Sequence, residues 1–237
     1  MGHFVFKHFT IDQSLAAMKI GTDGVLLGAW VDLPELSAPD FLDVGCGSGL
    51  VALQLAQRYQ TARITGIDID DKAIEASHLN FQGSPWSDRM QVVQSDFCQW
   101  ATNKFECFDA IVSNPPFFEG WRGQSSRDKA RSAHFLPLNE LISQAFALLR
   151  SNGVLSLILP ADRLSQAEQI GTRCGFALKR YCLVKGRADL PVKRVLLEWV
   201  KTSDWVITER EELIIELDRH VYSEEYRELT RDFYLNF

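Results

Sequence analysis

The 237-residue sequence lacks any hydrophobic run long enough to cross a membrane, since a spanning helix needs about 18 or more consecutive apolar residues. Its first residues show neither a signal-peptide pattern nor a myristoylation motif. The five cysteines are scattered and never spaced as Cys-x-x-Cys, which argues against a disulfide framework and against a zinc site. These absences predict a soluble cytoplasmic protein with no metal, no membrane contact and no evident stable protein partner.

The sequence also lacks the positive charge expected of a protein that binds nucleic acid, because its formal net charge is -6. Residues 203–237 hold ten acidic residues and four arginines, so that residues 1–202 are neutral overall. Within the neutral part, residues 122–134 carry four Arg or Lys residues and one Asp. A local basic loop decides phosphate contact better than an overall sum does. The net charge therefore does not exclude a nucleic-acid substrate.

Short apolar runs alternate with helical patterns from residue 39 onward. Strands are predicted at 41–44, 63–69, 90–96, 108–113, 154–160, 176–184 and 192–200. Helices are predicted at 50–59, 70–81, 137–150 and 161–173, with a short one between the third and fourth strands. This alternation predicts an α/β fold with a doubly wound, mostly parallel, seven-stranded sheet and an antiparallel edge at its end. The tail from 203 is expected to add a strand pair and a helix.

Three glycines, Gly45, Gly47 and Gly49, lie between the first predicted strand and the helix that follows. Glycine at such a turn allows positive φ and lets the backbone approach a ligand at the helix N-terminus. The spacing Gly-x-Gly-x-Gly differs from the dinucleotide fingerprint Gly-x-Gly-x-x-Gly, and no P-loop Gly-Lys-Ser/Thr follows. Taken alone, the loop is a weak motif, because such turns also occur without a ligand.

Acidic residues end the next two predicted strands. Asp68 can accept hydrogen bonds from ribose hydroxyls, as in nucleotide-binding sheets. Asp96 can accept from an adenine amino group, with Phe97 against the ring. Each acid has a structural alternative, because Asp68, its neighbour Asp70 or Asp96 can cap the following helix. Glycines, a ribose acceptor and an adenine acceptor in this order predict a nucleoside site without a phosphate clamp, and S-adenosylmethionine has that shape.

The segments DVGCGSG (43–49), GIDID (66–70) and QSDF (94–97) resemble the successive motifs of class I S-adenosylmethionine-dependent methyltransferases. The resemblance covers roughly residues 39–200 and implies a Rossmann-like fold with S-adenosylmethionine as cofactor. The residues that match its binding motifs are Asp43, Gly45, Gly47, Gly49, Asp68, Asp96 and Phe97. An NAD site is a weaker interpretation, because the glycine spacing is wrong for it.

The segment Asn-Pro-Pro-Phe follows the fourth predicted strand, at the edge where such sheets bind ligands. Proline has no N–H, so Pro115 and Pro116 make a rigid loop that offers carbonyl acceptors without competing donors. The Asn114 side-chain oxygen and the Pro115 carbonyl can both accept from one exocyclic amine, and acceptors off the ring plane favour a pyramidal, nucleophilic nitrogen. Phe117 can stack on the base. We predict these four residues to be catalytic, with a plain proline turn capped by Asn114 as the alternative.

Asn-Pro-Pro-Phe resembles the signature of amino-group methyltransferases, whose acceptors include adenine N6, guanine N2 and a glutamine amide. The segments FKHFTIDQSLAAMKIGTDGVLLGAW (6–30), NPPFF (114–118) and RVLLEW (194–199) are similar to the bacterial tRNA1(Val) adenine-37 N6-methyltransferases over nearly the whole chain. This resemblance implies methylation of adenine N6 in tRNA. An RNA guanine-N2 methyltransferase, a protein glutamine methyltransferase and a non-catalytic RNA-binding module remain alternatives.

The same resemblance implies one methyltransferase domain over residues 1–237. It consists of an N-terminal segment that covers cofactor and substrate (1–38), a core (39–200) and an acidic C-terminal extension (201–237). Lys19 and Thr22 would line the cofactor site from the N-terminal side, together with Asn114. Contacts with RNA are expected from Phe118, Arg122, Arg127, Lys129, Arg131 and His134, and further ones from Lys7, His8, Lys193 and Arg194. The alternative to RNA binding for residues 122–134 is a solvated loop without a ligand.

Overall fold

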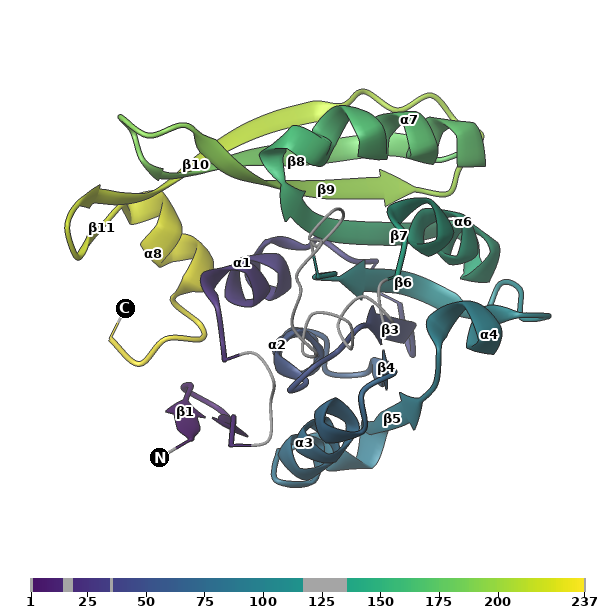
Figure 1. Ribbon diagram of the computed structural model, residues 1–237, viewed down its shortest axis with the longest axis horizontal. Coiled ribbons are helices and arrows are strands. Elements are labelled where there is room, and N and C mark those ends of the chain that lie inside the picture. Colours follow the sequence, from purple (N-terminus) through teal and green to yellow (C-terminus); the bar gives the residue numbers. More distant parts are fainter. Residues whose placement is uncertain (1, 15–18, 35, 117–135, 237) are drawn as a thin grey trace, which may run out of the picture.

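A computed structural model describes residues 2–14, 19–34, 36–116 and 136–236 of the protein (Figure 1). In this part of the chain, nine strands form one sheet in the order β11-β10-β8-β9-β7-β6-β3-β4-β5. Its strands are β3 (Asp40–Val44), β4 (Arg63–Asp68), β5 (Met90–Gln94), β6 (Phe108–Ser113), β7 (Leu149–Pro160), β8 (Ala177–Arg187), β9 (Val192–Val200), β10 (Glu209–Asp218) and β11 (Val221–Tyr222). A separate hairpin pairs β1 (His3–Val5) with β2 (Thr10–Asp12).

Helices cover both faces of the sheet (Figure 1). One face carries α1 (Thr22–Trp30), α2 (Leu50–Arg58), α3 (Asp71–Gln82) and α8 (Glu224–Thr230). The other carries α4 (Phe97–Ala101), α6 (Leu138–Leu148) and α7 (Leu164–Cys174). Short 3-10 turns, η1 (Ser87–Arg89) and η2 (Ala161–Arg163), precede β5 and α7.

The period-two pattern of the strands explains the two cores. On β7, Val154 and Ile158 face the core under α1 and α2, whereas Leu155, Leu157 and Leu159 face the core under α6 and α7. Successive side chains of a strand point to opposite faces, so a central strand covered on both sides must be apolar at nearly every position. The apolar run at 154–160 therefore correctly indicated a central strand that is buried on both faces.

The sheet is doubly wound and mostly parallel, as predicted. Strands β5, β4, β3, β6 and β7 run parallel to one another, whereas β9 is antiparallel to both neighbours. One detail differs from the expectation: the antiparallel strand β9 lies between β7 and β8, so it is not an edge. The seven predicted strands are present, and the strand pair expected in the tail, β10 and β11, extends the described sheet to nine, with β10 parallel to β8.

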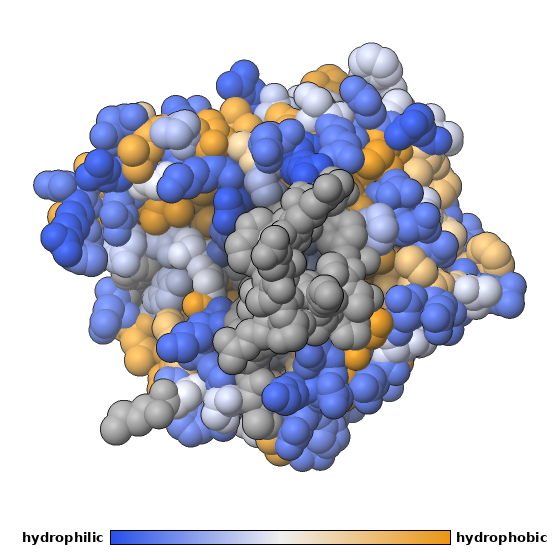
Figure 2. Space-filling view, in the orientation of Figure 1, coloured by the Kyte–Doolittle hydropathy of each residue, from blue (hydrophilic) through white to orange (hydrophobic). Residues whose placement is uncertain are grey.

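The tail is acidic where it forms this sheet edge. Hydrophilic residues gather over β10 and β11 at the left of Figure 2, and β10 carries Glu209, Glu211, Glu212, Glu216 and Asp218. Charged side chains along an edge strand discourage pairing with another chain. Much of the acidic excess that makes the net charge of the protein negative therefore lies at one edge of the sheet.

The two ends of the chain pack against each other. The Phe4 and Phe6 rings lie 4.7 Å apart, and the Tyr234 ring is 6.2 Å from Phe4 and 6.0 Å from Phe6 between centroids. The Lys7 amide donates to the Phe233 carbonyl over 2.9 Å. The N-terminal hairpin, which the strand pattern did not predict, is thus held by the C-terminal segment. Among the described residues, no helix is both long and apolar enough to cross a bilayer.

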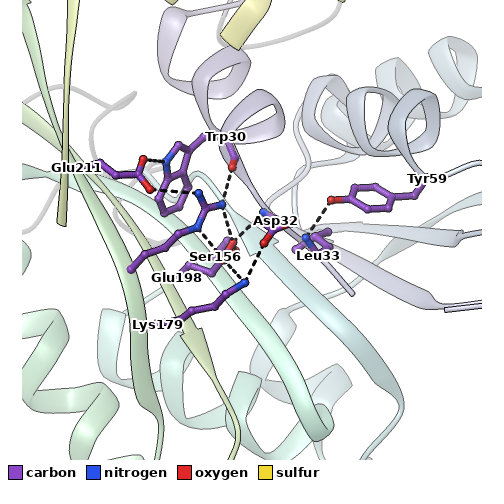
Figure 3. A network of polar contacts seen from close by, with 9 residues as sticks. Trp30, Asp32, Leu33, Tyr59, Ser156, Lys179, Glu198 and Glu211 are labelled. Atoms are coloured by element: carbon purple, nitrogen blue, oxygen red, sulfur yellow. Dashed lines mark hydrogen bonds and ion pairs between the residues drawn. The ribbon is translucent and has the colours of Figure 1, made fainter. Parts of the chain in front are cut away.

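A buried polar network joins α1 to the strands beside it (Figure 3). Glu198 of β9 is fully buried, and its Oε1 accepts from Arg180 over 3.0 Å and lies 3.2 Å from Lys179 Nζ. Its Oε2 accepts from the Ser156 hydroxyl at 3.1 Å and the Asp32 amide at 3.0 Å. A buried carboxylate is tolerated when its lone pairs are satisfied in this way.

Arg180 extends the network to the end of α1 and to the tail. Its guanidinium lies 3.9 Å from the centroid of the Trp30 ring and donates to the Trp30 carbonyl over 2.7 Å. The Trp30 indole N–H donates to Glu211 of β10 over 2.8 Å. The C-terminal end of α1 is therefore bound to β8, β9 and β10, and its N-terminal end points toward the carboxyl ends of the parallel strands, near Asn114.

We expect Glu198→Ala to lower the free energy of unfolding by about 3–5 kcal/mol, because it leaves buried donors without their acceptor. The control is Glu228→Ala, which removes an ion pair with Arg231 that is more than half exposed, 56% and 58% for the two side chains. It should change stability little. Urea denaturation measures both. Equal effects of the two substitutions would contradict a structural role for the network.

Candidate functional site

The carboxyl ends of four neighbouring parallel strands meet at one edge of the described sheet. Val44 of β3 pairs with Ile67 of β4 and with Ser113 of β6, and Asp68 pairs with Gln94 of β5. The chain moves outward from β3 to β4 in one direction and from β6 to β7 in the other. Such a switch point is where open α/β sheets bind ligands. The glycine loop, Asp68, Asp96 and Asn114 all follow these strand ends, as the sequence predicted.

The glycine loop has the left-handed geometry that its sequence predicted. The φ angles of Gly45, Gly47 and Gly49 are +71°, +56° and +81°. A Cβ at Gly45 or Gly47 would meet nothing within 4 Å, whereas a Cβ at Gly49 would lie 2.4 Å from the Phe81 ring. The first two glycines therefore leave open space for a ligand to approach the backbone, and the third permits close packing of α2 on α3.

Asp68, the last residue of β4, and Asp70, two residues later, have different roles, which the sequence had left open. Asp70 caps α3, because its side chain accepts from the amides of Lys72 and Ala73. Asp68 instead accepts from the Gly47 amide over 2.9 Å and from the Asp70 amide over 3.0 Å. Each carboxylate oxygen has two lone pairs, so the half-buried Asp68 can hold the glycine loop and still accept from a ribose.

The residues after β5 take a different arrangement. Asp96 caps α4, with one oxygen accepting from the Gln99 amide over 2.9 Å. Phe97 is 6% exposed and belongs to the core under α4 and α6. The capping alternative for Asp96 is thus realised, with its second carboxylate oxygen left for a ligand. The Phe97 ring contributes mainly to packing.

Asp43 lies beneath the glycine loop and is buried. One of its oxygens accepts from the Ala52 amide in the first turn of α2 over 3.1 Å, where a helix N-terminus favours negative charge. Burial nevertheless raises the pKa of the carboxyl to about 7, and the neighbouring Asp68 charge adds to the rise. Asp43 therefore joins the end of β3 to the first turn of α2, next to the glycine loop.

Asn114 stands at the end of β6, half-buried beside the glycine loop, with Pro115 buried and Pro116 exposed. The Ser113 hydroxyl donates to the Val44 carbonyl over 2.7 Å, which joins the ends of β6 and β3. Within the described part of the chain, the Asn114 amide has no hydrogen-bond partner, so its oxygen and nitrogen are available to a substrate.

Helix α1 brings the N-terminal segment to the same place. An ideal Cβ at Gly24 would lie 2.9 Å from a terminal methyl group of Leu50 and 3.9 Å from the Asn114 side-chain nitrogen, so glycine permits the close approach of α1 to α2 without a shift of Leu50. Thr22 begins α1 and is exposed, as is Lys19 before it. Their role in lining the cofactor site stays a prediction from the resemblance.

The basic residues expected to bind RNA are only partly described. Phe117, Phe118, Arg122, Arg127, Lys129, Arg131 and His134 lie outside the described residues. Lys193 and His8 are exposed, and the Lys7 ammonium donates to the Arg231 carbonyl. Arg194 forms an ion pair with Asp23 of α1 over 2.8 Å. The structure therefore gives Arg194 a role in holding α1.

Several side-chain contacts that support the site were not predicted from the sequence. Ser113, Asn80 and the Asp23–Arg194 pair connect elements that are far apart in the chain. A single serine, asparagine or charged residue carries no motif. Nothing in the sequence pattern pointed to these contacts, although Ser113 directly precedes Asn-Pro-Pro-Phe.

The open space at the glycine loop and the donor set of the site suit S-adenosylmethionine. Gly45 and Gly47 leave space at the loop, and Asp68 offers a carboxylate to hydroxyl groups. No lysine or arginine stands in the loop 43–49 to bind a phosphate. Among the described residues, no group of three His, Cys, Asp or Glu side chains could hold a metal ion. The fold and the site together define a class I S-adenosylmethionine-dependent methyltransferase.

Comparisons with known proteins agree with this class and narrow it. The family model of the methyltransferase small domain matches residues 24–170. The crystal structure of a predicted O-methyltransferase from Agrobacterium tumefaciens is similar over 89% of this chain and 96% of that chain, with a TM-score of 0.70 and 21% identity, which shows the fold alone.

Curated relatives are more similar still. A tRNA1(Val) (adenine(37)-N6)-methyltransferase of Phocaeicola vulgatus is 43% identical over 99% of this chain and 98% of its own length. One of Vibrio cholerae is 38% identical over 98% of this chain and 95% of its own length. The chain belongs to the family of tRNA1(Val) (adenine(37)-N6)-methyltransferases, as its sequence motifs predicted.

Substitution by alanine should have different effects on stability at Gly45, where a Cβ meets open space, and at Gly49, where it meets Phe81. Gly45→Ala should cost about 1–2 kcal/mol of stability, from its positive φ alone, and should weaken S-adenosylmethionine binding, because the new methyl group enters the ligand space. Gly49→Ala adds a clash with Phe81, so its stability loss should be larger by about 1–3 kcal/mol. Urea denaturation and calorimetric titration measure the two effects. Equal stability losses would disprove the distinction.

Asp43 should make stability depend on pH. Its folded-state pKa of about 7 lies above the ordinary value of 3.8, so its favourable contribution is complete below about pH 4 and is lost as pH rises through 7. Asp43→Asn removes this titration. The melting temperature of the variant, relative to the parent without cofactor, should therefore rise from pH 4 to about 7 and then level off.

The control for Asp43 is Asp232→Asn at a side chain that is 76% exposed. Its melting temperature should follow that of the parent at every pH. A parallel course of Asp43→Asn and the parent across the same range would mean that the Asp43 carboxyl is not held neutral by its burial.

Proposed function

We propose that this protein transfers the methyl group of S-adenosylmethionine to the exocyclic N6 of an adenine in tRNA, at adenine 37 of tRNA1(Val), as in the names of its relatives. The observation that carries the proposal is the Asn114 amide. It is half-buried, unpartnered among the described residues, and placed beside a glycine loop with open space above its backbone. We also expect the protein to act in the cytoplasm, where its tRNA substrate is found.

The chemical difficulty lies in the acceptor. The lone pair of an aryl amine is delocalised into the ring, so the nitrogen is a poor nucleophile. The Asn114 side-chain oxygen and the Pro115 carbonyl can each accept one N–H, which holds the nitrogen in a pyramidal form with its lone pair directed away from them. Proline supplies a carbonyl without a competing N–H. This pair of acceptors is specific for an NH2 group.

The remaining residues bind and orient. Bound S-adenosylmethionine supplies an electrophilic methyl group on a sulfonium. Asp68 and Asp96 offer carboxylate oxygens to a ribose and an adenine amine, and the glycine loop admits the ligand close to the backbone. Correct orientation of two reactants can contribute about 7–11 kcal/mol to a reaction. No strong base is needed, because the amine proton becomes acidic once the nitrogen is alkylated.

The base must leave its stack before it can reach Asn114. Chemistry on a nucleobase requires a flipped or splayed nucleotide, and an anticodon loop presents its bases more readily than a helix does. We propose that Phe117 and Phe118 contact this base and that the cationic residues 122, 127, 129 and 131, with His134, meet the flanking phosphates. The sequence order, with these residues directly after the prolines, supports this role.

The acceptor is identified by mass spectrometry of nucleosides, after incubation of the protein with S-adenosylmethionine and unmodified total tRNA. New N6-methyladenosine is the expected product. N2-methylguanosine would keep the amine chemistry and change the substrate. The absence of any methylated nucleoside would contradict a tRNA substrate and direct the search to other RNA and to protein amides.

Asn114→Ala should lower turnover by about 100-fold or more, which is typical of losing one positioned hydrogen-bond partner of a reacting group. Its affinity for S-adenosylmethionine should stay close to that of the parent. The matched control is Asn139→Ala, at an exposed position early in α6, which should change neither. Single-turnover kinetics and calorimetric titration measure the two quantities. A parallel loss of cofactor affinity would place Asn114 in the cofactor site instead.

A further inference from the structure

Asn80 of α3 ties the N-terminal hairpin to the glycine loop. Its side-chain oxygen accepts from the Asp12 amide over 2.8 Å, and its nitrogen donates to the Asp12 carbonyl over 3.2 Å and to the Ser48 carbonyl over 2.9 Å. The side chain is 5% exposed. Both donor hydrogens and the oxygen are therefore used, and one amide spans two segments that are 36 residues apart in sequence.

The bond pattern explains why an amide stands here. Toward Asp12, Asn80 provides one acceptor and one donor, which continues the pairing of β2 as a neighbouring strand would do. Toward Ser48, it provides a donor to a carbonyl of the glycine loop. Only an amide offers this combination at this length. Phe81, the next residue of α3, fills the space under Gly49, so two adjacent residues of one helix support the loop.

A second side-chain contact joins the residue after the N-terminal hairpin to the residues that precede α1. The Gln13 side-chain oxygen accepts from the Ile20 amide over 2.7 Å. Ile20 immediately precedes Gly21, which caps α1 without any side-chain hydrogen bond. A Cβ at Gly21 would meet nothing within 4 Å. Gly21 itself therefore adds no side-chain contact at the start of α1. We infer that the position of this helix end depends on the neighbouring contacts of Ile20 and Asp23.

The far end of the segment is held at the acceptor site. The ion pair between Asp23 and Arg194 spans 2.8 Å and joins α1 to the start of β9, and Gly24 lies close to Leu50 and Asn114. Asp12 is therefore connected through Asn80 to the glycine loop, and Gly24 lies beside the Asn114 amide. The glycine loop and Asn114 are the two places that the cofactor and the acceptor base would occupy.

We propose that Asn80 and Gln13 are positioning residues that hold residues 12–14 and 19–24 as parts of one wall of the S-adenosylmethionine site. They act through Ser48, Asp12 and Ile20. The inference rests on the proposed methyltransferase function for its cofactor, and not on the identity of the acceptor base.

The test measures cofactor affinity without RNA. Asn80→Leu keeps the size of the side chain and removes all three hydrogen bonds. Its dissociation constant for S-adenosylmethionine, measured by calorimetric titration, should rise about tenfold or more. Amide hydrogen exchange should become faster at Asp12 and across the glycine loop. Turnover at saturating cofactor should fall less than affinity does, because Asn80 touches no reacting group.

The matched control is Ser84→Ala, next to the end of the same helix. The Ser84 hydroxyl is also buried, 8% exposed for the residue, and donates to the Phe81 carbonyl over 2.8 Å. Its loss should reduce stability while leaving cofactor affinity and exchange at Asp12 unchanged. An equal rise in dissociation constant for both variants would overturn the proposal, since general destabilisation would then explain it. Parental affinity in a folded Asn80→Leu protein would overturn it as well.

Gln13→Ala provides an independent test of the proposal if the Asn80→Leu protein does not fold. Gln13 is half-buried and its loss removes one side-chain contact, so we expect a folded protein whose dissociation constant rises about threefold. Parental affinity together with parental exchange at Ile20 would refute the role of the segment. A failed tRNA assay alongside the expected cofactor response would instead count only against the proposed acceptor.

Discussion

The parallel pairing of β3 with β4 on one side and β6 on the other is the constraint on which the rest of the structure depends. It puts the glycine loop, Asp68 and Asn114 at one edge, although they come from separate parts of the chain. The Ser113 hydroxyl on the Val44 carbonyl joins β6 to β3 at the last residue before both functional loops. A shift of one residue in this register would turn every side chain of the strand to the other face. The site therefore inherits its geometry from the sheet.

The segments outside the parallel core complete the site by contacts at both ends of α1. The network around Glu198 fixes its C-terminal end to β8, β9 and the tail strand β10, while Asp23 and Arg194 hold its N-terminal end next to Asn114. The aromatic rings of Phe4, Phe6 and Tyr234 bind the N-terminal hairpin to the tail. The acidic extension is thus part of the support for the cofactor side, as well as a sheet edge protected by charge.

Motif and periodicity predicted most of the core, and their failures have physical reasons. The apolar runs at 108–113 and 192–200 became strands with the predicted bounds, because burial on both faces leaves little choice of residue. Asp68 and Asp70 could not be told apart by sequence, since a carboxylate after a strand can cap or bind equally well. The burial of Phe97 in the core under α4 was not predicted either, because the pattern around QSDF does not show which way the ring turns. The order of β8 and β9 depends on pairing across the sheet, which local pattern does not contain.

From residue 39 onward, the sequence by itself determined the succession of strands and helices along the chain, the left-handed glycine loop and the position of Asn-Pro-Pro directly after β6, because each depends on the residues within a short segment. Only the tertiary structure decided which acid supports the loop, where the tail pairs, and how Asn80 and Arg194 hold the N-terminal segment. These contacts join residues separated by tens to hundreds of positions. A hydrogen bond or an ion pair of this kind leaves no periodic trace in either segment, since its geometry exists only after the sheet has brought the two together.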